Sequence, residues 1–191
     1  MSNYKNYLRR TLAGMDLDAD RILSIGAQED DRKYFRHVRC EEWKTMDIDE
    51  QFNPSIVFNM NREILSEDDG DLALDSDYIE HFDKVLALNL WEYIYDPVTA
   101  HKNIYRLLRT DGTYMGSYVF VYGKHPPNGT DYLRYTDDGI RKLLTAALFR
   151  DINIIPIPCS DVLRQFYANE GMRVRKDIDH NIVGYIATAR K

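Results

Sequence analysis

Segments typical of β-strands alternate with helical segments along most of this chain, and this alternation limits its fold more than any other feature. Helices are expected at residues 2–13, 32–38, 96–112 and 137–149, and a helix followed by a turn at residues 160–172. Runs with the apolar or alternating character of strands lie at residues 21–27, 41–49, 54–61, 76–90, 113–123, 152–158 and 181–190. Strands that alternate with helices assemble into a parallel sheet. The sequence therefore predicts an α/β fold.

Length and composition predict a single domain over residues 1–191, in which residues 1–18 form an N-terminal helical extension. With 44% hydrophobic residues, the chain can bury a core without cross-links. The net charge of −6 argues against nucleic acid as a partner, because nonspecific binding to phosphates requires clustered Lys and Arg. No apolar run approaches the roughly 20 residues that cross a bilayer, and we expect a soluble cytoplasmic protein.

The cysteine content predicts neither a disulfide framework nor a zinc site. Cys40 and Cys159 are the two cysteines, and neither has a second Cys or a His at the spacing of metal ligands. We expect two reduced thiols and no bound metal.

Two predicted strands end in residues suited to binding a nucleoside. Gly26 and Ala27 end the first strand, where the missing Cβ of glycine lets a ligand approach the backbone. Asp47 and Ile48 end the second, where an acid can accept hydrogen bonds from ribose hydroxyls. Asp49 points the same way as Asp47 in an extended chain, and we choose Asp47 by its position. The alternative is that both acids only solvate a loop.

Two later segments carry a more specific pattern. Residues 88–97 read LNLWEYIYDP, and residues 125–136 read HPPNGTDYLRYT. The first resembles a segment that ends in Leu-Glu-His with a later Asp-Pro. The second resembles a His-x-x-Pro-x-Asp-Tyr-x-Arg-x-Thr signature. Both patterns occur in class I S-adenosylmethionine-dependent methyltransferases similar to type 11, and about residues 20–190 resemble this family.

The resemblance implies a Rossmann-like methyltransferase sheet of seven strands, mostly parallel with an antiparallel last strand, with helices on both faces. It also implies S-adenosylmethionine as the cofactor. The family's Gly-x-Gly-x-Gly segment is degenerate here, since residues 24–30 read SIGAQED. Glu29 and Asp30 disfavour a pyrophosphate more than they disfavour a sulfonium cofactor without phosphate.

The resemblance assigns further cofactor contacts to the ends of the third and fourth strands. Asn59 and Met60 occupy the position that meets the adenine ring, and Asn89, Leu90 and Trp91 occupy the position that lines the methionine end. An amide oxygen can accept from the adenine amino group as a carboxylate does. The alternatives are that Asn59 caps a turn and that Trp91 belongs to the core.

The same resemblance places the acceptor chemistry in residues 125–136. His125 is the candidate general base, because its ordinary pKa lies near the working pH. Arg134 could hold an anionic or polyhydroxylated acceptor through its forked donors, while Tyr132 and Tyr135 line the acceptor site.

An architectural alternative accounts for part of this segment. Its prolines stiffen the loop, Asp131 pairs with Arg134, and Thr136 caps the helix that follows. We assign the architectural role to Asp131 and Thr136 and keep the functional role for His125.

The expected reaction moves a methyl group from S-adenosylmethionine to an oxygen or nitrogen of a small-molecule or glycan acceptor. Neither nucleic acid nor a membrane is expected as a partner, and the oligomeric state stays open, with a homodimer as one option. Two alternative functions are considered as well. One is a methyltransferase-like interaction protein that has lost cofactor binding, and the other is a small α/β enzyme that uses a different nucleotide.

Replacing His125 with Ala should lower turnover about 100-fold or more while leaving cofactor affinity nearly unchanged, because a general base acts on the acceptor alone. The release of S-adenosylhomocysteine measures the first quantity and calorimetric titration the second. Equal turnover in the variant would remove His125 from this role.

Overall fold

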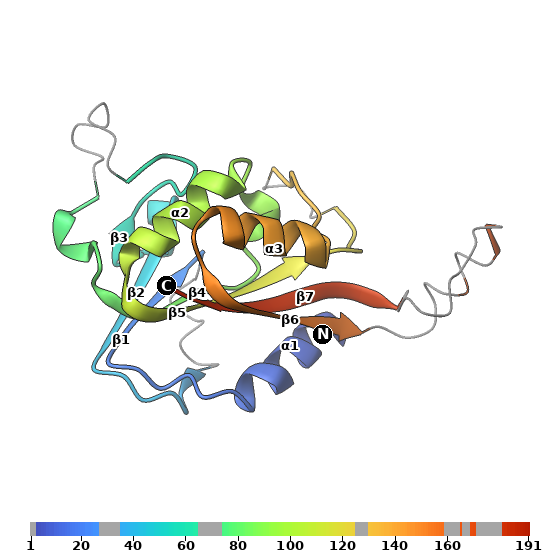
Figure 1. Cartoon of the computed structure of the whole chain (residues 1–191), viewed down its shortest axis with the longest axis horizontal. Helices are drawn as coiled ribbons and strands as arrows, with labels where there is room; N and C mark the ends of the chain where they lie inside the picture. The colour runs from blue at the N-terminus through green and yellow to red at the C-terminus, as the bar shows by residue number, and fades with distance from the viewer. Residues whose placement is uncertain are drawn as a thin grey trace.

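The computed structural model describes residues 3–26, 35–64, 74–124, 130–158, 165, 169–170 and 181–191. The described strands form a seven-stranded sheet in the order β3-β2-β1-β4-β5-β7-β6 (Figure 1). Their bounds are β1 Arg21–Ile25, β2 Glu42–Asp47, β3 Ile56–Val57, β4 Phe82–Ala87, β5 Leu108–Val119, β6 Arg150–Pro158 and β7 Ile182–Arg190. The α-helices are α1 Asn3–Ala13, α2 Pro97–Leu107 and α3 Asp137–Ala146, with 3₁₀ turns η2 Glu50–Phe52, η4 Ser76–Tyr78 and η5 Trp91–Tyr93.

The pairing of the strands confirms the predicted sheet. Strands β1 to β5 pair in parallel, whereas β7 runs antiparallel to both β5 and β6. The strand order reverses between β1 and β4, where the chain leaves toward β2 and β3 and returns on the other side of β1. In open α/β sheets, ligands bind beyond the carboxyl ends of the strands at such a reversal.

Helices cover both faces of the sheet, as predicted (Figure 1). Alternate residues of β1 point to opposite faces, so Leu23 joins the core under α2 and α3 while Ile22 joins the core under α1. On the α1 side, Leu8 and Leu12 of the helix pack in the same cluster as Ile22. Thr136 caps α3 by accepting from the backbone N–H of Gly139 at 3.2 Å, as predicted.

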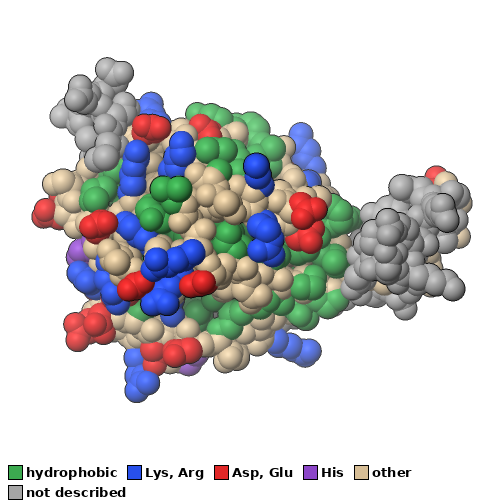
Figure 2. Space-filling view, viewed as in Figure 1, with side chains coloured by type: hydrophobic (Ala, Val, Ile, Leu, Met, Phe, Trp, Pro, Cys, Tyr) green, Lys and Arg blue, Asp and Glu red, His purple; other side chains and the backbone are tan. Residues whose placement is uncertain are grey.

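Charged side chains are paired at the edge of the sheet where the parallel strands begin and the antiparallel β7 ends, away from the strand ends that carry the candidate site. Arg109 pairs with Asp83 at the starts of β5 and β4, and Asp111 pairs with Arg150 and Arg190. Figure 2 shows Lys and Arg side chains lying beside Asp and Glu on one side of the molecule.

A stack of buried aromatic rings fills the core beneath the carboxyl end of β4. The rings of Trp91 and His101 lie 3.8 Å apart and nearly parallel, and Tyr118 stacks on Trp91 at 5.3 Å. His101 donates from Nδ1 to the carbonyl of Pro97 and accepts at Nε2 from the Tyr118 hydroxyl at 2.8 Å. Burial lowers the pKa of His101 to about 4, so the ring is neutral at pH 7.

A glycine in β5 makes room for this stack. A Cβ at Gly116 would lie 1.9 Å from the hydroxyl oxygen of Tyr114. That hydroxyl donates to the Tyr118 hydroxyl at 2.7 Å, because the Tyr118 proton is already given to His101. The stack is therefore both close-packed and connected by hydrogen bonds.

Several predicted element bounds differ from the structure, and the largest differences lie around α2, β5 and β3. The helix predicted to reach residue 112 ends at Leu107, and β5 begins at Leu108 rather than 113. The helix ends early because the carbonyls of Arg106 and Leu107 accept backbone N–H groups from Glu80 and His81 at 2.8 and 3.0 Å. The strand predicted at 54–61 is limited to Ile56–Val57.

The helix predicted at 32–38 is wrong where it is described, because residues 35–38 form a turn in which the N–H of Val38 donates to the carbonyl of Phe35 at 2.9 Å; residues 32–34 lie outside the described residues. The segment between β6 and β7 also lies mostly outside them.

Acid should destabilise the protein through His101. Its pKa is about 4 in the fold and about 6.5 in the unfolded chain, so its contribution is complete above pH 6.5 and is lost as the pH falls toward 4. Lowering the pH from 7.5 to 5 should cost about 2 kcal/mol of unfolding free energy through this residue. Urea unfolding of His101→Gln should show a correspondingly smaller pH dependence, and an unchanged pH dependence would contradict this assignment.

Candidate functional site

The carboxyl ends of β1 and β4 meet at Gly26 and Leu90. Gly26 has φ +69° and donates its N–H to the carbonyl of Met46 at 2.8 Å. A Cβ built on Gly26 would lie 2.8 Å from Cδ1 of Leu90. The structure therefore brings these two predicted residues into contact. Residue 26 has no room for a side chain larger than the hydrogen atom of glycine. Ala27 lies outside the described residues.

The end of β2 presents an acid beside an exposed apolar side chain. Asp47 is partly buried and accepts the backbone N–H of Asp49 through Oδ1 at 3.0 Å. Ile48 is 61% exposed, although it follows a strand inside the sheet. Asp49 caps η2 by accepting the N–H of Gln51 at 2.9 Å. Each acid thus accepts a local backbone N–H, and Asp47 is the one that follows the strand paired with β1, so its ribose contact stays a prediction.

At the end of β3, amide side chains tie two loops together. Asn59 accepts at Oδ1 from the backbone and side-chain N–H groups of Asn61, at 3.0 and 3.1 Å. Asn61 in turn accepts from the backbone N–H groups of Tyr95 and Asp96. Asn59 therefore makes the turn-capping contacts of the alternative, and its adenine contact stays a prediction. Met60 is buried in the core.

The residues after β4 divide between surface and core. Asn89 is exposed, has φ +54° and donates its N–H to the buried hydroxyl of Ser117 at 2.9 Å. Leu90 is half-buried against Gly26, while Trp91 is fully buried in the aromatic stack. Trp91 thus has the contacts of a core residue, and its place in a pocket wall stays a prediction.

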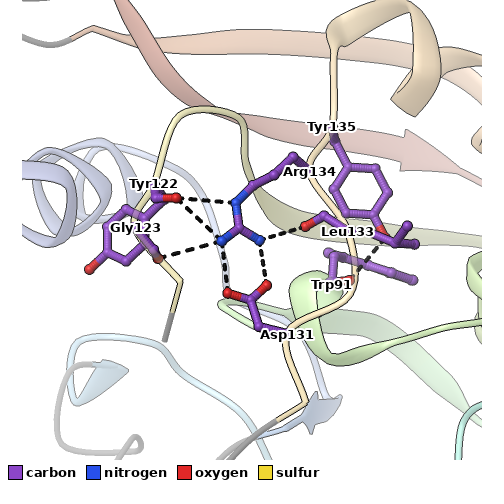
Figure 3. A network of polar contacts seen from close by, with 7 residues as sticks. All are labelled: Trp91, Tyr122, Gly123, Asp131, Leu133, Arg134 and Tyr135. Carbon is purple, nitrogen blue, oxygen red and sulfur yellow. Dashed lines mark hydrogen bonds and ion pairs between the residues drawn. The ribbon is translucent and has the colours of Figure 1, made fainter. Parts of the chain in front are cut away.

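Arg134 directs its guanidinium donors to acceptors within the protein (Figure 3). It donates to both carboxylate oxygens of Asp131, one of them at 2.7 Å, and to the carbonyls of Tyr122, Gly123 and Leu133. Asp131 raises the pKa of Arg134, and its own side chain is only 1% exposed. The Asp131–Arg134 pairing expected in the architectural alternative is confirmed, while acceptor binding by Arg134 stays a prediction.

The segment that contains Arg134 also docks on η5. The hydroxyl of Tyr135 donates to the carbonyl of Trp91 at 2.9 Å, and the N–H of Tyr132 donates to the carbonyl of Glu92 at 2.7 Å. Tyr135 is buried, whereas Tyr132 is 48% exposed. The residues predicted for the acceptor and for the methionine end are therefore neighbours. His125 lies outside the described residues.

The sequence analysis assigned no role to Glu92. The structure places this residue between those predicted for the acceptor and those predicted for the methionine end of the cofactor. Glu92 is 1% exposed, and its carboxylate oxygen Oε2 has no hydrogen-bond partner in the part of the chain described. Burial raises the pKa of Glu92, Asp131 adds to the rise, and Arg134 opposes it. The glutamate was visible in LNLWEYIYDP, but its burial beside a second loop was not.

The described residues contain neither a metal site nor a membrane-spanning helix. They hold no group of three or more His, Cys, Asp or Glu side chains arranged to bind a metal ion. None of their helices combines the length and apolar character needed to span a bilayer.

Solved structures share this fold over nearly the whole chain, although no protein-family model and no curated protein matches the sequence. A methyltransferase from Archaeoglobus fulgidus, described as S-adenosylmethionine-dependent, superposes with a TM-score of 0.62 at 15% identity, covering 100% of this chain and 95% of the other. One from Mesorhizobium loti gives 0.63 at 13% identity, with 98% of each chain covered.

A third similar structure has a defined acceptor. The 1,6-didemethyltoxoflavin-N1-methyltransferase of Burkholderia thailandensis, solved with its acceptor and S-adenosylhomocysteine, gives a TM-score of 0.58 at 16% identity and covers 100% of this chain and 78% of the other. The chain therefore has the fold of class I S-adenosylmethionine-dependent methyltransferases, as the resemblance implied.

Replacing Gly26 with Ala should lower the unfolding free energy by about 1–2 kcal/mol, because an L-residue is strained at this positive φ and its Cβ meets Leu90. Gly123→Ala is the matched control, since a Cβ there has nothing within 4 Å. Urea denaturation of both variants measures the difference, and equal stability would contradict the close approach of β1 to Leu90.

Proposed function

We propose that this protein transfers a methyl group from S-adenosylmethionine to an oxygen or nitrogen of a small-molecule or sugar acceptor. The observation that carries the proposal is the meeting of the strand ends at the β1–β4 reversal, where Gly26 without a Cβ packs against Leu90. The proposal is also supported by the fold that the chain shares with S-adenosylmethionine-dependent methyltransferases. One of these is an N1-methyltransferase according to its name.

The residues at the carboxyl ends of β1 to β4 would suit the cofactor. Asp47 would hold the ribose through a carboxylate oxygen, and the 61% exposed side chain of Ile48 offers an apolar surface to the adenine ring. Asn59 would meet the adenine edge, with Met60 packing beneath. Asn89 and Leu90 would line the methionine end, supported from the core by Trp91. When bound, the cofactor supplies a methyl carbon already activated by its sulfonium.

The remaining work of the protein is to align the acceptor and exclude water, because the methyl carbon is already activated. We call residues 130–136 the acceptor segment. The Asp131–Arg134 pair holds this segment against the end of β5, and the Tyr135 hydroxyl holds it against Trp91. Tyr132, exposed at the same edge, would contact the acceptor. His125 is proposed as the base that takes the acceptor proton.

A second candidate function is an interaction protein that has lost the cofactor. The degenerate segment at residues 24–30, with a single glycine, favours it. The two candidates differ in whether the carboxyl ends of the strands bind a nucleoside.

Calorimetric titration with S-adenosylhomocysteine tests the proposal, and we expect a dissociation constant in the micromolar range together with a thermal shift. Asp47→Asn should weaken binding about tenfold, because a charge-assisted hydrogen bond is lost. Asp49→Asn, two residues along the same loop, is the control and should bind normally. Absence of heat with the unaltered protein would favour the interaction protein, and preferential binding of NADH would favour an enzyme with another nucleotide.

A further inference from the structure

Glu92 carries a buried carboxylate oxygen that lacks a hydrogen-bond donor. Its Oε2 atom is fully enclosed and has no partner among the described residues. Leaving such a group unpaired costs free energy, and native structures retain one where a ligand, water or ion completes it or where it has a function. An N–H or O–H group of a bound molecule would satisfy this oxygen.

The place of Glu92 in the fold points to the acceptor as that molecule. It lies in η5, directly after the residues proposed for the methionine end of the cofactor. Its carbonyl accepts the N–H of Tyr132, the exposed tyrosine of the acceptor segment, at 2.7 Å. Asp131 and Arg134 lie close enough to shift its pKa. Glu92 is therefore at the junction of the two proposed subsites.

Two exposed tyrosines stand at the same junction. Tyr95 and Tyr132 are 58% and 48% exposed, and their ring centroids lie 5.7 Å apart at an angle of 74°. Tyr95 is fixed by its backbone N–H, which donates to Asn61 at 3.0 Å. Burial and the nearby Glu92 raise the pKa of Tyr93, which follows Glu92 in the chain. Aromatic faces in this arrangement attract cations.

The charges of the cluster also favour a cation. Arg134 is neutralised by Asp131, which accepts through both carboxylate oxygens (Figure 3). Glu92 forms no ion pair with a Lys or Arg of the described chain. An anionic acceptor would be repelled by this carboxylate, and an alcohol would gain nothing from the tyrosine faces.

From these contacts we infer that the acceptor is an amine, which binds as its ammonium ion with Glu92 as the counter-charge and Tyr95 and Tyr132 as the aromatic wall. This inference rests on the proposed methyltransferase function and narrows its acceptor from an oxygen or nitrogen compound to an amine. Glu92, Tyr95 and Tyr132 are accordingly specificity-determining residues.

Calorimetry on the full chain saturated with S-adenosylhomocysteine tests the inference with three probes of similar shape: phenethylamine, 2-phenylethanol and 3-phenylpropionate. The amine should bind about tenfold more tightly than the alcohol and the carboxylate. Glu92→Gln should remove this preference without changing the affinity for S-adenosylhomocysteine. Glu41→Gln, an exposed glutamate before β2, is the matched control and should keep it.

Substitutions of an exposed residue keep the test decisive if Glu92→Gln does not fold. Tyr95→Phe keeps the aromatic face and should retain amine binding, whereas Tyr95→Leu should weaken it severalfold. Amine binding no tighter than that of the alcohol, or equal binding by the Phe and Leu variants, overturns the inference and leaves the methyltransferase proposal standing. Failure of S-adenosylhomocysteine to bind at the outset overturns both.

Discussion

The parallel pairing of β1 with β4 is the contact on which the candidate site depends. Ile25 lies opposite Ala87, so the chain segments that leave these two strands emerge side by side. Gly26 and Leu90 meet there, at the reversal of strand order. Without this pairing, the residues that end β2 and β3 would not share one edge of the sheet with those that end β4.

The core and the site are built from the same residues. Trp91 stacks on His101 inside the molecule, while its carbonyl accepts the hydroxyl of Tyr135, which lies in the segment of residues 130–136. The ion pair of Asp131 with Arg134 then joins that segment to the end of β5. A change in the aromatic stack would therefore alter the site as well as stability, because the stack supports the loop from below.

Much of the fold could be predicted because it follows from local patterns. The apolar run at 21–25 and the alternating run at 182–190 both became strands, and Thr136 caps its helix through a hydrogen bond three residues away. The boundary between α2 and β5 could not be predicted, since it depends on Glu80 and His81, which lie far away in sequence. The same limit applies to the site, where Gly26 was foreseen but the burial of Glu92 was not.

The sequence by itself determined the alternation of strands and helices, the glycine that ends β1 and the polar residues that follow the strands, because short-range periodicity and residue chemistry carry that information. Only the tertiary structure decided which of these residues meet. It gave Asp49 to a turn and left Glu92 with an unpaired oxygen beside Tyr132. Contacts between distant segments arise from packing in three dimensions, and no local pattern encodes them.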